Sequence, residues 1–273
     1  MSRLTTLNLL PYQAAIVTDD PEAKKIVVHG RRMGATVAAA ARAIERETHN
    51  PQGTLYMTPT RGSADYFQAC CEQWIHVTGA RARVMPVRPD SQCKVVKGLI
   101  SIMVVSDGDR VVQALRGQRI PRIIIDSAAY VKRLKAIYSA IMMTPDLLLL
   151  SDWAEETFER DNDFNDLARR LKARRLASVH IIDLDTALKG GLYREFCRVR
   201  GEAYSQEREW DWRAEQVHNH GDEGYRTLFC GLPQPLPDGK MSPDQWSLSR
   251  AARFNQQSGR PPTPIYTGDT SNW

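Results

Sequence analysis

The chain has 273 residues, 42% of them hydrophobic and 25% charged, a composition that excludes the disordered and fibrous classes. Its formal net charge of +5 permits an anionic partner such as nucleic acid but does not require one. The five cysteines, without CxxC spacing, fit neither a disulfide framework nor a zinc site, and the lack of a signal sequence or long apolar run predicts a cytoplasmic protein without membrane contact.

The first two-thirds of the chain alternate short β-branched runs with amphipathic or alanine-rich stretches. This pattern predicts an α/β fold with a mostly parallel sheet flanked by helices. The expected strands are residues 25–29, 53–58, 82–86, 99–106, 122–126, 147–151 and 178–184. The expected helices are residues 35–47, 63–78, 128–140 and 163–174.

The character of the sequence changes after about Glu209. From Gly231 onward, closely spaced proline and glycine residues remove helix and sheet hydrogen bonds, which predicts an irregular C-terminal extension interrupted by a short helix at 243–255. We therefore divide the chain into a domain of residues 1–210 and an extension of residues 211–273. The extension is either a docking segment or a terminus without a role.

The stretch GRRMGAT follows the first expected strand and opens a helix. In a phosphate-binding loop of the form GxxxxGK[ST], backbone amides hold phosphate oxygens, the lysine contacts the β and γ phosphates, and the Ser/Thr hydroxyl binds Mg²⁺. Gly34 and Thr36 occupy the expected positions, whereas Ala35 replaces the lysine. Unless Arg31 or Arg32 supplies the lost charge, transition-state stabilisation is reduced. Alone, the loop is either a phosphate site or an ordinary strand-turn-helix.

A carboxylate ends another expected strand, RIIID, at Asp126. In NTPases a carboxylate at such a position holds Mg²⁺, and a glutamate that usually follows it polarises the attacking water. Here the next residue is Ser127, whose hydroxyl is not a base near neutral pH without a partner. Asp126 therefore either binds Mg²⁺ or caps a following helix.

Several segments in chain order carry a resemblance to a known family. They are LLPYQAAIV, VVHGRRMGAT, TLYMTPTRGSADYF, VVQALRGQRIPRIIIDSAAYV and LLLLSDW. Together they resemble the ATPase domain of the large terminase subunit of tailed phages and herpesviruses, the motor that packages DNA into a procapsid. The resemblance covers roughly residues 8–210 and implies a P-loop NTPase-like fold with ATP and Mg²⁺ as cofactors.

The resemblance also assigns roles to individual residues. It implies adenine recognition by Gln13, Mg²⁺ binding by Thr36 and Asp126, and a catalytic set of Arg31, Asp126 and Ser127. The implied nucleotide-binding residues are Gln13, Gly30, Arg31, Arg32, Gly34, Ala35 and Thr36. The family's lysine and glutamate positions are Ala35 and Ser127, so hydrolysis is expected to be weak or lost.

The function implied by the resemblance is that of an ATPase domain in a viral DNA-packaging motor. Its implied partners are double-stranded DNA, a portal protein, a small terminase subunit, a separate nuclease and further copies of the chain. The family's next domain is an RNase H-like nuclease, and the residues after Trp210 are too few to form one completely. The alternative is a non-catalytic pseudo-ATPase adaptor that binds DNA, portal or a partner subunit.

Other polar clusters have simpler interpretations. Asp183 and Asp185 alternate onto one face of an expected strand, where they either share a metal or, as we expect, end the strand and cap a helix. Residues 218–223 contain two histidines and two carboxylates, which we expect in a solvated loop. The basic run 169–180 either meets DNA phosphates or is a solvated face.

Overall fold

The computed structural model describes residues 9–18, 24–30, 33–89, 94–105, 107–152, 162–174 and 176–228. Its centre is an eight-stranded sheet in the order β3-β5-β2-β6-β7-β1-β8, with β4 also paired to β5, and all pairs are parallel. The strands are β1 (Lys24–His29), β2 (Thr54–Thr58), β3 (Arg83–Val84), β4 (Arg88–Pro89), β5 (Leu99–Val104), β6 (Arg122–Asp126), β7 (Asp146–Ser151) and β8 (Ser178–Ile182). The predicted α/β fold is confirmed.

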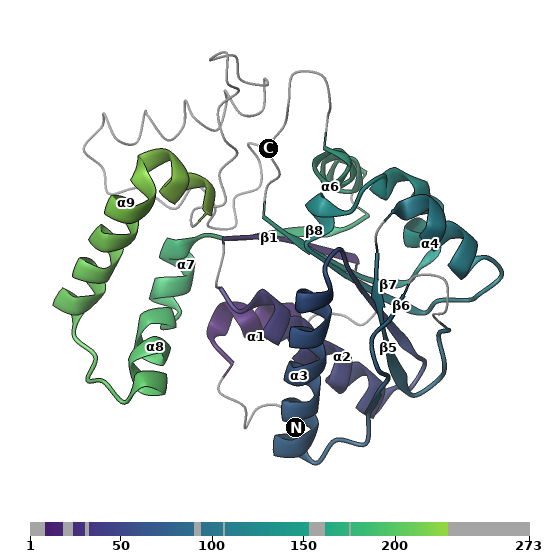
Figure 1. The fold of residues 1–273 in the computed structure, drawn as a ribbon, viewed down its shortest axis with the longest axis horizontal. Coiled ribbons are helices and arrows are strands. Elements are labelled where there is room, and N and C mark those ends of the chain that lie inside the picture. Colours follow the sequence, from purple (N-terminus) through teal and green to yellow (C-terminus); the bar gives the residue numbers. More distant parts are fainter. Residues whose placement is uncertain are drawn as a thin grey trace.

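Helices cover both faces of the sheet (Figure 1). They are α1 (Pro11–Val17), α2 (Ala35–His49), α3 (Arg61–Thr78), α4 (Gly108–Leu115), α5 (Tyr138–Met143), α6 (Asp163–Ala173), α7 (Leu184–Lys189), α8 (Leu192–Arg200) and α9 (Gln206–Leu228), with 3₁₀ turns η3 (Ala128–Tyr130) and η4 (Leu134–Ile137). One apolar core joins the sheet to α1, α2, α3, α7 and α8, and a second joins the opposite face to α4, α5, α6 and the 3₁₀ turns.

Alanine side chains explain how closely α2 packs. Ala38 to Ala41 are fully buried between the sheet, α1 and α3, because a methyl group lets helix and sheet backbones approach. Further along α2, Glu47 accepts a hydrogen bond from Arg122 at the start of β6 (2.9 Å), and Arg42 is paired with Asp146 at the start of β7 (2.9 Å). These buried ion pairs hold the end of α2 at the amino edge of the sheet, so its start lies at the carboxyl edge.

The prediction of a single helix at residues 128–140 is wrong. Residues 128–143 instead form η3, η4 and the short α5, because Ser127 (φ 56°) and Arg133 (φ 52°) adopt left-handed conformations that interrupt a right-handed helix. The strand β4 was missed because two residues ending in proline give no periodic signal. The short helices α1, α4 and α8, none longer than nine residues, were missed as well, and so was the long helix α9.

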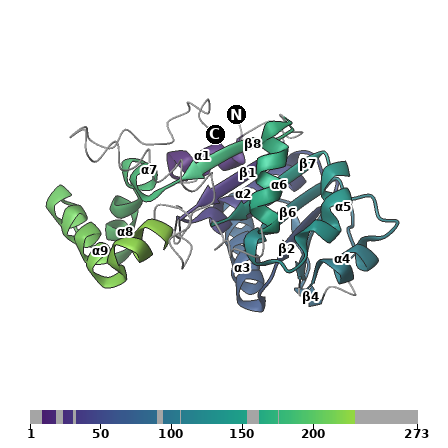
Figure 2. The same cartoon turned by 90° about the horizontal axis from the view of Figure 1, so that it is seen from above.

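Beyond the β8 edge of the sheet, α7, α8 and α9 form a helical arm (Figure 2). The aromatic ring of Trp212 on α9 lies 5.5 Å from Tyr193 and 5.8 Å from Phe196 on α8, centroid to centroid. The helix α9 runs continuously through the boundary we predicted between residues 210 and 211. The short helix expected at 243–255 lies outside the described residues. In the part of the chain that is described, no helix has the length and apolar character needed to cross a bilayer.

Candidate functional site

The loop between β1 and α2 is built around Gly34. Its left-handed conformation (φ 71°) starts α2, and a Cβ atom at this position would collide with the Gln13 side chain. The carbonyl of Met33 accepts hydrogen bonds from the Tyr12 hydroxyl (2.9 Å) and from Gln13 Nε2 (3.2 Å). Only glycine combines this left-handed conformation with the absence of a side chain, which the contact with Gln13 requires. The two hydrogen bonds to Met33 hold the loop against α1.

Both ends of the Gln13 amide are occupied by backbone groups. Its Oε1 accepts from the Leu10 amide (3.0 Å), its Nε2 donates to Met33, and the residue is 8% exposed. Gln13 therefore braces the loop in this structure. The adenine contact implied by the resemblance stays a prediction.

The start of α2 and the end of β6 meet at the carboxyl edge of the sheet. Thr36 Oγ1 donates to Asp126 Oδ2 at 2.6 Å, across 90 residues of sequence, and Asp126 is 4% exposed. The alternative role for Asp126 was to cap a helix that starts at Ala128. In the structure the 3₁₀ turn η3 starts there instead, and its cap residue is Ser127, which makes no side-chain cap hydrogen bond. The two residues predicted to bind Mg²⁺ are thus in direct contact.

Tyr56 is a third member of this site that the sequence reasoning missed. Its hydroxyl donates to the same Asp126 oxygen at 2.9 Å, and its ring stacks on Phe67 with centroids 3.5 Å apart. Burial, followed by the charge and hydrogen bond of Asp126, raises the pKa of Tyr56 well above its ordinary value. Tyr56 lies in an expected strand, but only the strand order reveals that this strand neighbours β6.

The chain turns sharply after Asp126. Ser127 adopts φ 56° and ψ 40°, and the following backbone folds over the end of β7. There, the Ala129 amide donates to Ser151 Oγ (3.1 Å) and the Tyr130 hydroxyl donates to Asp152 Oδ2 (2.9 Å). The turn after β6 is therefore tied to the end of β7 by two hydrogen bonds.

The remaining predicted loop residues have different positions. The amide of Gly30 donates to the Ile182 carbonyl (3.0 Å), which continues the pairing of β1 with β8. Ala35 is 4% exposed and belongs to the same apolar core as Tyr12 and Met33. Arg31 and Arg32 lie outside the described residues. The side chain in the lysine position is consequently a buried methyl group.

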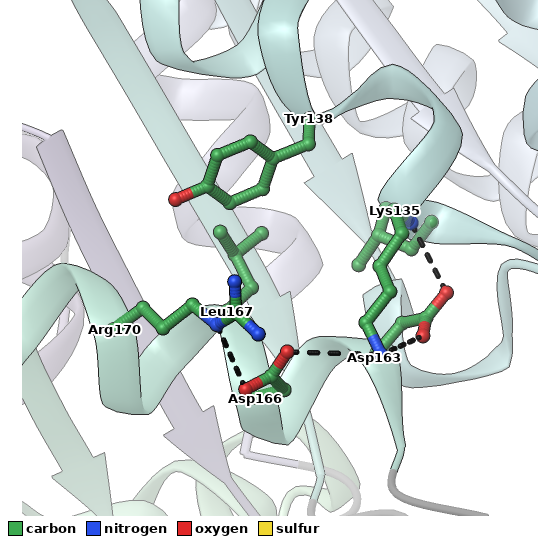
Figure 3. Close-up of a pocket in the computed structure, with 7 residues that line it drawn as sticks. Lys135, Tyr138, Asp163, Asp166, Leu167 and Arg170 are labelled. Carbon is green, nitrogen blue, oxygen red and sulfur yellow. Dashed lines mark hydrogen bonds and ion pairs between the residues drawn. The ribbon is translucent and has the colours of Figure 1, made fainter.

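A pocket of about 250 Å³ lies on the other face of the sheet (Figure 3). It is lined by Leu134, Lys135, Tyr138, Asp163, Asp166, Leu167 and Arg170. Its charges neutralise one another, because Lys135 pairs with Asp163 (3.2 Å) and Arg170 with Asp166 (3.0 Å). None of these residues belongs to the loop, to α2 or to β6, so this pocket is separate from the site around Thr36 and Asp126.

The other candidate metal clusters have structural roles. Asp183 caps α7 through the Thr186 amide (2.7 Å), as expected, and Asp185 pairs with Arg213 (2.8 Å). Residues 218–223 lie within α9, so the loop predicted for them is wrong. Among the described residues, no three or more His, Cys, Asp or Glu side chains gather as a metal site.

Thr36 and Asp126 nevertheless suit Mg²⁺. This ion prefers oxygen ligands and usually takes only one or two from the protein, with water and phosphate supplying the rest. The Thr36 hydroxyl and the Asp126 carboxylate, 2.6 Å apart at a helix start, offer such a pair.

Comparisons with known proteins give one relative by sequence and several by fold. No protein-family model matches the chain. The chain is 25% identical over 243 residues to the Mu-like prophage FluMu protein gp28 of Haemophilus influenzae, covering 81% of this chain and 46% of that protein.

Solved structures give the fold. The large terminase of a thermophilic bacteriophage has a TM-score of 0.57 at 10% identity, over 82% of this chain and 53% of that one. The same terminase in complex with ADP gives 0.56 at 12% identity, over 83% and 54%. A mutant ATPase domain of the large terminase of a Thermus phage gives 0.50 at 14% identity, over 80% of this chain and 91% of that domain. The chain thus has the fold of a large-terminase ATPase domain, and it spans about half the length of the full-length proteins it matches.

Proposed function

We propose that this chain acts as the nucleotide-binding, ATPase-like domain of a viral DNA-packaging motor, with weakened hydrolysis. The observation that carries the proposal is the 2.6 Å hydrogen bond between Thr36 and Asp126. It brings a helix start that follows a glycine turn together with a carboxylate at the end of a parallel strand. Nucleotide sites in open α/β folds lie at this carboxyl edge.

The residues of this edge would divide the work of holding Mg·ATP. Backbone amides at the start of α2 and the positive end of its dipole would face the phosphates. Thr36 and Asp126 would supply oxygen ligands to Mg²⁺, which neutralises phosphate charge when bound. Arg31 and Arg32 would add charge near the phosphates, as the resemblance implies. The ADP complex of a terminase with this fold supports nucleotide as the ligand class.

The partners follow from the proposed motor. They are double-stranded DNA, a portal protein, a small terminase subunit, a separate nuclease and further copies of this chain. The net charge of +5 is compatible with a DNA partner, since phosphate contacts supply most non-specific affinity for DNA.

A second candidate function is a pseudo-ATPase adaptor that keeps the fold without turnover. Two observations favour it. Ala35 is buried in the apolar core, where the motif calls for a lysine, and Ser127 adopts a left-handed conformation where a glutamate is usual. Both departures remove charged groups from the site while leaving its hydrogen bonds intact.

Calorimetric titration of the protein with Mg·ATP tests the proposal. Thr36→Ala should abolish the binding that the unaltered chain shows, because it removes the hydroxyl ligand of Mg²⁺. Thr48→Ala is the matched control, since Thr48 lies on the same helix and its hydroxyl bonds to the Ile44 carbonyl (2.7 Å), away from Asp126. The absence of binding at millimolar nucleotide would refute a nucleotide site. Binding without turnover in the presence of DNA would favour the adaptor.

A further inference from the structure

Hydrolysis of a phosphoanhydride needs a group that orients the attacking water, and a carboxylate is well suited to this role. Ser127 does not supply one. We propose that Asp152, at the end of the neighbouring strand β7, is the carboxylate that orients this water. The inference rests on the proposed function, because it concerns the same nucleotide site.

The sheet order places Asp152 between the two halves of the site. The strand β7 lies between β1, which leads into the loop, and β6, which ends at Asp126. In register, Val28 pairs with Ser151 and Asp126 pairs with Leu150. Asp152 therefore follows directly at the carboxyl edge, beside the start of the loop and just beyond the level of Asp126.

Strand periodicity favours the same face of the sheet for both carboxylates. Leu148 and Leu150 on β7 pack in the core shared with α2, as Ile124 does on β6. Side chains two residues apart share a face, so Asp126 follows Ile124 onto the α2 side, where it meets Thr36. Asp152 is the first residue after β7, so one further step of this alternation corresponds to the α2 side for its backbone position, and its carboxylate contacts Ser151 and Tyr130 at the end of the strand.

Hydrogen bonds hold Asp152 to the turn that lacks the usual carboxylate. Tyr130 donates to Oδ2 at 2.9 Å, and Ser151 Oγ donates to Oδ1 at 3.4 Å while accepting from the Ala129 amide. One donor to the carboxylate, Tyr130, thus comes from the turn that follows Ser127, and the other is its chain neighbour Ser151. Fixed orientation is what a group that positions water requires.

The other described carboxylates that follow strands at this edge cap or pair with neighbouring elements. Asp183 caps α7. Asp107 caps α4 through the Asp109 amide (2.9 Å), and Asp109 pairs with Arg133. These residues follow β8 and β5, which do not lie between β1 and β6. Asp152, in contrast, follows β7, which lies between β1 and β6.

The step assigned to Asp152 is a water attack on the γ phosphate. The carboxylate accepts a hydrogen bond from water, whose oxygen forms a bond to the γ phosphorus. The bond from that phosphorus to the oxygen bridging to the β phosphate breaks, and ADP leaves with that electron pair. The water proton passes to Asp152 and then to solvent, so the products are ADP, inorganic phosphate and a proton.

The test compares hydrolysis and binding of Mg·ATP in the full chain, with linear double-stranded DNA present. Asp152→Asn should lower kcat at least about a hundredfold, the range for loss of a general base, while the calorimetric Kd for Mg·ATP changes by less than about threefold. Asp152→Glu should recover part of the rate. Asp163→Asn, which alters an ion pair on the opposite face, is the control and should leave both values unchanged.

Each result decides a different point. Turnover by Asp152→Asn at the rate of the unaltered chain would overturn the assignment and leave nucleotide binding standing. Mg·ATP binding by the unaltered chain without any turnover would also overturn it. Failure of the unaltered chain to bind Mg·ATP would refute the proposed function itself, and the role of Asp152 with it.

Discussion

The hydrogen bond from Tyr56 to Asp126 allows a sharp test of how this site is held together. Tyr56→Phe removes one hydroxyl and keeps the ring that stacks on Phe67. Both partners are buried, with Tyr56 at 0% and Asp126 at 4% exposure. A hydrogen bond to a charged acceptor contributes about 1.5–3 kcal/mol, so the variant should lose roughly 2 kcal/mol of unfolding free energy. Against a typical total of about 5–15 kcal/mol, this loss is readily measured.

Urea denaturation measures the effect, and the slope of the transition should stay constant because the fold is unchanged. The control is Tyr138→Phe, which alters a hydroxyl in the pocket on the opposite face and should change stability by less than about 0.5 kcal/mol. Thr36→Val acts on the same Asp126 oxygen, so its effect should not add to that of Tyr56→Phe. If Tyr56→Phe were as stable as the control, or if the two site variants were additive, the carboxylate would not depend on these donors.

Further predictions concern stability, pH and turnover. Glu47→Ala should cost about 3–5 kcal/mol in urea denaturation, because it removes the buried acceptor of Arg122, Thr54 and the Gly53 amide and leaves Arg122 only its longer pairing with Asp146 (3.5 Å). Burial raises the pKa of Tyr56, so the folded state holds the hydroxyl proton more tightly than the unfolded state does. The resulting stabilisation is complete below pH 10.0, the ordinary pKa of tyrosine, and is lost as the pH rises above it. Alkaline unfolding should show this loss, and Tyr56→Phe should reduce it. Ala35→Lys should raise DNA-stimulated hydrolysis by itself, with little added by Ser127→Glu, because Asp152 is proposed to supply the carboxylate. A rate that requires both changes would contradict this.

The sequence predicted the strands well because apolar β-branched runs bounded by turn residues carry a strong local signal. It also selected Thr36 and Asp126 as partners from motif spacing, and the structure places them in contact. It missed Tyr56 because the neighbour of a strand in a parallel sheet depends on long crossovers, which periodicity does not encode. The sequence analysis predicted one helix at 128–140 because Ser127 and Arg133 adopt positive φ angles, and neither is a glycine, the residue that usually signals this conformation in a sequence.

The order of the strands is the basis for the proposal that a site without two of its expected charged residues still supports hydrolysis. The strands β6 and β7 are paired and their ends lie side by side at the carboxyl edge. A carboxylate that orients water can therefore stand at the end of either strand. The turn at Ser127 removes the usual carboxylate position from β6 and brings Tyr130 to Asp152 at the end of β7. At the lysine position, Ala35 is buried within the core that holds α2, so replacement of the lost charge depends on the proposed roles of Arg31 and Arg32. Under this proposal, the loss at 35 should limit phosphate binding more severely than the loss at 127 limits the activation of water.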